Sequence, residues 1–127
     1  MAPTPLPTGE ELQEMDYDTI KAHLKTARGQ YTKILTRTRK VTDGAVALPS
    51  ARIAIEIEEL KTMLETRDAH LDLAMLYAIE KAGGNAERIL FWTDRIKTLE
   101  EEHTDISGEI MIALTRCPST QPQFQGV

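Results

Sequence analysis

The chain has 127 residues, a formal net charge of −5 and a hydrophobic fraction of 41%, which together fit one globular domain with a modest core. The lone cysteine, Cys117, excludes an internal disulfide. The N-terminus has no signal-peptide pattern, and no stretch approaches the roughly 20 apolar residues that span a bilayer. We therefore expect an intracellular protein, cytoplasmic by default, with no membrane contact.

Charged side chains are segregated along the chain. Residues 1–18 carry five acidic and no basic side chains, whereas residues 19–42 carry seven basic and no acidic ones. From residue 43 onward acidic side chains again predominate. The first long helix is thus expected to be basic within an otherwise acidic protein, which points to contacts with oppositely charged groups.

The two ends of the chain differ in composition from its middle. Pro3, Pro5 and Pro7 are incompatible with a helix at the start, so residues 1–16 are expected to form a flexible, proline-rich, acidic arm. Residues 117–127 contain two prolines and three glutamines and are expected to be a polar linker or tail. That tail suggests a fragment of a longer protein.

Apolar residues that recur at alternating steps of four and three predict helices over residues 17–42, 51–82 and 86–116. The first stripe consists of Ile20, Leu24, Ala27, Tyr31, Ile34, Thr38 and Val41. The second consists of Ile53, Ile57, Leu60, Leu64, Arg67, Leu71, Ala74 and Ala78. The third consists of Ile89, Trp92, Ile96, Leu99, His103, Ile106, Ile110 and Ala113.

The predicted helix ends carry the residues that usually start and stop helices. Asp16 or Asp18 is expected to cap the first helix, Ser50 the second and Asn85 the third. Gly44, and the Gly83–Gly84 pair, are expected to close the first and second helices.

These patterns predict an all-α fold, because a repeat of about 3.5 residues buries its stripe only against another helix. The short connection at 83–85 requires the second and third helices to fold back as an antiparallel coiled-coil hairpin. The basic first helix would pack alongside and complete an elongated three-helix bundle.

The hairpin has candidate interface residues at two places, an apolar turn in the third helix and an arginine in the second. Leu90 and Phe91 extend the stripe position Trp92, so this turn is apolar on most sides and either meets another subunit or packs against the first helix. Arg67 occupies a stripe position in the second helix. It either contacts another subunit or extends its charged end toward solvent.

The basic side chains of the first helix are candidate nucleic-acid contacts. They are Lys21, Lys25, Arg28, Lys33, Arg37, Arg39 and Lys40. If they are exposed, they would bind phosphates with a salt-dependent affinity. The alternative is that the acidic faces of the other two helices neutralise them within the bundle.

Signatures of catalysis or of a resident cofactor are lacking in the sequence. Glu100 and His103 have the Glu-x-x-His spacing of di-iron bundles, but the second pair fails because Arg67 precedes His70. We therefore predict no enzyme, no metal and no cofactor. The expected function is an assembly or scaffold module that self-associates or binds a helical partner; the alternative is a nucleic-acid-binding module.

The order of these elements resembles the N-terminal helical region of Gag polyproteins of BEL/Pao-type retroelements. The resemblance lies in the basic stretch at residues 27–37, ARGQYTKILTR, followed by the acidic heptad segment EIEEL at residues 56–60. It covers roughly residues 20–115. It implies a self-assembling structural protein with nucleic-acid contacts and without catalytic residues.

Overall fold

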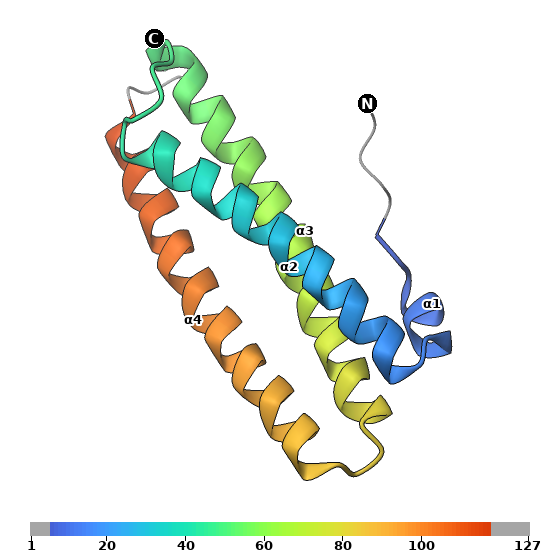
Figure 1. Cartoon of the computed structure of the whole chain (residues 1–127). Coiled ribbons are helices and arrows are strands. Elements are labelled where there is room, and N and C mark those ends of the chain that lie inside the picture. The colour runs from blue at the N-terminus through green and yellow to red at the C-terminus, as the bar shows by residue number, and fades with distance from the viewer. Residues whose placement is uncertain (1–5, 118–127) are drawn as a thin grey trace, which may run out of the picture.

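The computed structural model describes residues 6–117, which form four helices and no strand (Figure 1). The helices are α1 (Gly9–Glu14), α2 (Tyr17–Thr42), α3 (Ser50–Lys81) and α4 (Ala86–Arg116). Figure 1 shows an elongated bundle in which α3 and α4 form a hairpin and α2 lies along both. The predicted all-α, three-helix bundle is confirmed, with one additional short helix.

The helix starts follow local hydrogen-bond chemistry. The Asp16 carboxylate accepts a hydrogen bond of 2.8 Å from the Thr19 amide at the start of α2. Hydrogen bonding to the Thr19 side chain, and then to this amide, lowers the pKa of Asp16. The Asn85 side chain accepts one of 3.1 Å from the Arg88 amide at the start of α4. The prediction for α3 is corrected: Pro49 takes the cap position without a side-chain bond, and Ser50 is already helical.

The helix stops depend on glycine. Gly44, after α2, has φ +78°, and Gly83 and Gly84, between α3 and α4, have φ +62° and +83°. Other residues rarely adopt this left-handed backbone, because their Cβ atom clashes there. The Gly83–Gly84 pair therefore reverses the chain and creates the predicted hairpin.

The N-terminal segment corrects our prediction of a flexible arm. Thr8 and Glu11 form a capping box, in which each side chain accepts a hydrogen bond from the other residue's amide. The resulting helix α1 packs on α3 and buries Leu12 completely. Lys81 at the end of α3 donates a hydrogen bond to the Gln13 carbonyl oxygen. Prolines precede α1 rather than interrupt it; residues 1–5 lie outside the described part of the chain.

The core lies where α2, α3 and α4 meet. Most predicted stripe positions are buried, but after Tyr31 the buried residue of α2 is Leu35 rather than Ile34. An α-helix has 3.6 residues per turn, so a stripe with a 3.5-residue repeat drifts around a nearly straight helix. None of the helices within residues 6–117 combines the length and the hydropathy needed to span a membrane. The predicted tail beyond Cys117 lies outside the described residues.

Candidate functional site

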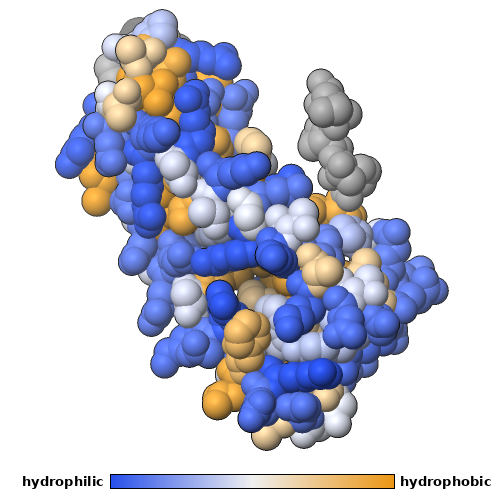
Figure 2. Space-filling view, in the orientation of Figure 1, coloured by the Kyte–Doolittle hydropathy of each residue, from blue (hydrophilic) through white to orange (hydrophobic). Residues whose placement is uncertain are grey.

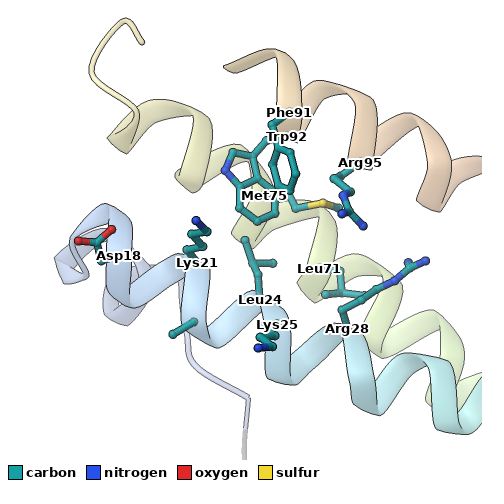
Figure 3. Close-up of a pocket in the computed structure, with 11 residues that line it drawn as sticks. Asp18, Lys21, Leu24, Lys25, Arg28, Leu71, Met75, Phe91, Trp92 and Arg95 are labelled. Atoms are coloured by element: carbon teal, nitrogen blue, oxygen red, sulfur yellow. The ribbon is translucent and has the colours of Figure 1, made fainter. Parts of the chain in front are cut away.

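A groove of about 490 Å³ opens between α2 and α4, and α3 forms its base (Figure 3). Its floor is apolar and draws on all three long helices: Leu24 from α2, Leu71 and Met75 from α3, and Phe91 and Trp92 from α4. In the space-filling view, hydrophobic surface shows between hydrophilic side chains on the face that α2 and α4 share (Figure 2). We refer to this feature as the α2–α4 groove.

Basic side chains surround the α2–α4 groove. Lys21, Lys25 and Arg28 come from α2 and Arg95 from α4, whereas Asp18 is the one acidic residue among those that line it. Arg28 forms an ion pair with Glu102 of α4. The Arg95 guanidinium lies 4.8 Å from the centroid of the Phe91 ring, in a cation–π contact. The edge of the groove therefore carries an excess of positive charge in a protein that is acidic as a whole.

The structure separates the predicted interface residues of α4. Leu90 is 70% exposed and Phe91 43% exposed, whereas Trp92 is only 6% exposed. The Trp92 Nε1 atom donates a hydrogen bond of 3.0 Å to the Tyr17 hydroxyl oxygen, and its ring meets Phe91 edge to face. Trp92 therefore packs against the first long helix, which was the stated alternative to a subunit contact, and it forms a fixed wall of the groove.

Arg67 makes a contact within the bundle that the sequence did not indicate. Its guanidinium donates a hydrogen bond to the Gln30 side-chain oxygen of α2, and the residue is half-buried. No ion pair joins Arg67 to an acidic side chain within the described residues. This hydrogen bond joins α2 to α3 within the bundle. The expected subunit contact of Arg67 stays a prediction.

The arginines and the lysines of α2 differ in whether they form ion pairs. The three arginines form ion pairs with acids of α3 and α4: Arg28 with Glu102, Arg37 with Glu56 at 3.1 Å, and Arg39 with Glu109 at 3.5 Å. The four lysines are exposed and have no carboxylate partner in the part of the chain that the structure describes; they are Lys21, Lys25, Lys33 and Lys40. Internal neutralisation therefore accounts for the arginines and leaves the lysines free.

A second helical stripe, which is not among the three predicted stripes, lies on the outer face of α3. We call it the α3 outer row: Thr62, Thr66, Ala69, Leu73 and Leu76. All five residues are exposed, uncharged and spaced at alternating steps of four and three. The Thr62 and Thr66 hydroxyls donate to the carbonyl oxygens of Glu58 and Thr62 on their own helix, at 3.1 and 3.0 Å. The signal was present in the sequence, but the more apolar inner stripe obscured it.

The histidines do not form a metal centre in the described residues. His103 Nδ1 lies 3.1 Å from the Tyr31 hydroxyl oxygen and 3.8 Å from the nearer carboxylate oxygen of Asp68. Burial raises the pKa of the Asp68 carboxyl, and the nearby imidazole opposes that effect. Nowhere within residues 6–117 do three or more His, Cys, Asp or Glu side chains gather closely enough to hold a metal ion.

No protein-family model, curated protein or solved structure matches this chain in comparisons with known proteins. The resemblance to retroelement Gag proteins therefore stays a prediction. The functional assignment accordingly depends on the exposed features described above: the α3 outer row, the free lysines of α2 and the α2–α4 groove.

Proposed function

We propose that this protein is an intracellular, non-enzymatic helical assembly module that self-associates, or binds a helical partner, through the α3 outer row. The observation that carries the proposal is the heptad spacing of five exposed, uncharged residues on one helix face. A stripe with that spacing becomes buried only when another helix packs along it. The row extends over about 21 Å of helix, at about 1.5 Å per residue.

The residue types in the row suit an antiparallel pair of copies. Ala69 stands at its centre, so an antiparallel partner centred there would place Leu73 and Leu76 against the Thr66 and Thr62 methyl groups. Small residues opposite large ones allow two helices to approach closely. Burying one leucine side chain contributes about 1.5–3 kcal/mol, so four leucines per pair are a sizeable driving force.

Acidic residues beside the row predict how salt affects this association. Glu65 and Asp72 lie on one flank of the row, one heptad apart. In an antiparallel pair these like charges approach each other, and salt screens their repulsion. We therefore expect self-association to strengthen as the salt concentration rises.

The test is the molar mass in solution, measured by light scattering on the wild type and on two charge-matched variants. Leu73→Glu combined with Leu76→Glu should reduce an associated wild type to a monomer, because it places charges in the buried row. Met111→Glu combined with Ile112→Glu changes two exposed apolar residues of α4 and should leave the mass unchanged. A wild type that is monomeric at every salt concentration would contradict self-association.

The resemblance to BEL/Pao-type Gag regions adds a biological setting to this proposal. It implies that the module belongs to a structural polyprotein that assembles from many copies. Support for that setting comes from the heptad and charge patterns alone, and its test is whether association continues beyond a dimer. Mass that rises steadily with concentration would support assembly, and a closed dimer would argue against it.

Nucleic-acid binding is a second candidate, and the four free lysines of α2 are the observation in its favour. From Lys21 to Lys40 they cover about 28 Å of helix, at about 1.5 Å per residue. If each contacted a phosphate of single-stranded RNA, the logarithm of the affinity would fall with the logarithm of salt at a slope of about −3. Fluorescence anisotropy with labelled RNA at about 50 and about 200 mM salt measures that slope. Absence of binding at the lower salt would exclude this candidate.

A further inference from the structure

We infer that the α2–α4 groove binds a single-chain amphiphile with an anionic head group, such as a fatty acid. This activity goes beyond the proposed assembly function and uses a different surface, since the α3 outer row contributes nothing to the groove. Neither the heptad pattern nor the charge pattern of the sequence indicates it. The inference combines three observations: the size of the groove, its apolar floor and its unpaired positive edge.

The size of the groove suits a small molecule better than a helix. Its volume of about 490 Å³ lies within the range of roughly 300–1,000 Å³ that is usual for small-molecule sites. A partner helix would instead need a trough for a cylinder about 10–12 Å wide along several turns. One hydrocarbon chain fits a volume of this size.

The floor of the groove favours such a chain. Leu24, Leu71 and Met75 present aliphatic side chains, and the Trp92 ring closes one side. The hydrogen bond from Trp92 to Tyr17, and the edge-to-face contact with Phe91, hold that ring in place. Because the wall is already ordered, a ligand does not have to immobilise it, and less affinity is lost on binding.

The edge of the groove favours a negative head group. Lys21, Lys25 and Arg95 have no carboxylate partner within the described residues. Figure 3 shows the guanidinium groups of Arg28 and Arg95, which come from different helices, directed toward the same end of the groove. A carboxylate at that end would pair with Arg95, while Arg28 keeps its bond to Glu102.

Other ligand classes match only one half of this surface. An uncharged hydrocarbon would fill the floor and leave the cations without partners. A nucleic acid would pair with the cations and leave the apolar floor exposed to water. An anionic amphiphile satisfies both halves, because its chain covers the floor while its head group reaches the edge.

Trp92 provides a local readout, since it is the only tryptophan in the chain and it lines the groove. The experiment titrates the full chain with dodecanoate, kept below the concentration at which it forms micelles, and follows Trp92 fluorescence. Dodecyltrimethylammonium, which has the same chain and a positive head group, serves as the ligand control. We expect saturable binding of dodecanoate that is at least about tenfold tighter than that of the cation. Equal affinities, or no saturable change with dodecanoate, would overturn the inference.

Charge-reversal variants locate the site. Lys25→Glu combined with Arg95→Glu should weaken dodecanoate binding by about tenfold. Lys33→Glu combined with Lys40→Glu makes the same change in net charge on exposed lysines outside the groove and should leave the affinity unchanged. Circular dichroism shows whether both variants keep the helical fold. Equal weakening in both variants would mean a non-specific charge effect and would overturn the assignment of the groove.

The same titration distinguishes this inference from the assembly proposal. The Leu73→Glu, Leu76→Glu variant alters the α3 outer row and leaves every groove residue in place. It should bind dodecanoate with wild-type affinity even when it no longer self-associates. Loss of dodecanoate binding in this variant would contradict a site confined to the groove.

Discussion

The Nε2 atoms of His23 on α2 and His70 on α3 lie 2.7 Å apart. At this distance one imidazole donates a proton to the lone pair of the other, so at least one ring is neutral. The rings meet edge to face, with an interplanar angle of 83°, and His70 is buried. The pair therefore joins α2 to α3 only while one of the two Nε2 atoms is unprotonated and can accept the hydrogen bond from the other.

This contact predicts that acid destabilises the fold. Burial lowers the pKa of both rings below 6.5, and the nearby His23 and Arg67 lower that of His70 further. Below about pH 6.5 the unfolded chain takes up protons that the folded chain excludes, so the free energy of unfolding falls as the pH falls. Linkage sets an upper limit of about 1.4 kcal/mol per pH unit for each imidazole.

Urea unfolding at about pH 7.5, 6.5 and 5.5 measures this dependence. In the control variant, His23→Gln combined with His70→Gln keeps an amide hydrogen bond possible and removes both titrating groups. Its stability should change less over this pH interval than that of the wild type. Identical pH dependence in the two proteins would assign the effect to other groups.

Tyr31 should ionise at a higher pH in the folded protein than in the unfolded chain. Burial raises its pKa to about 12, and the nearby charges of Asp68 and Glu102 contribute in the same direction. The folded chain keeps this proton above pH 10.0, where an unfolded tyrosine loses it, so stability falls as the pH rises through that range. Phenolate absorbance of the folded protein should include a transition near pH 12 that Tyr31→Phe removes; a difference between the two proteins that titrates near pH 10.0 instead would contradict this.

Leu12 should anchor the N-terminal helix to the bundle. We expect Leu12→Ala to lower the free energy of unfolding by about 2 kcal/mol, the lower end of the range for buried leucines, because α1 can undock once its anchor is lost. Leu90→Ala is the matched control, and its cost should stay within about 0.5 kcal/mol because that side chain is exposed. Equal costs for the two substitutions would show that α1 is not docked in solution.

The Arg28–Glu102 ion pair should contribute little to stability, although it joins α2 to α4. Its side chains are 34% and 33% exposed, so water screens the attraction. A double-mutant cycle with Arg28→Ala and Glu102→Ala should give a coupling free energy of at most about 1 kcal/mol, which decreases as salt is added. A coupling well above this value, or one insensitive to salt, would indicate a buried pair instead.

Features that depend on neighbours in the sequence were predictable from the sequence. Asp16 and Asn85 cap their helices through bonds to amides three residues ahead, and Gly44 ends α2 through its own backbone conformation. The stripes likewise identified most of the inner faces of the three long helices, because burial follows the helical period. The capping box between Thr8 and Glu11 is equally local, but the prolines that precede it led us to expect a flexible arm instead of a helix.

Features that depend on which helix covers which face appeared only in the tertiary structure. Trp92 and Leu90 are two residues apart in one apolar turn, yet one packs beside Tyr17 and the other faces solvent. The partners of Arg67 and Arg28 are distant in sequence, so no local pattern indicated Gln30 or Glu102. The α2–α4 groove exists because residues from three helices converge there. A heptad pattern specifies that one face of a helix is buried against another helix. Only packing in three dimensions decides which helix that is, and where a groove remains between two neighbouring helices.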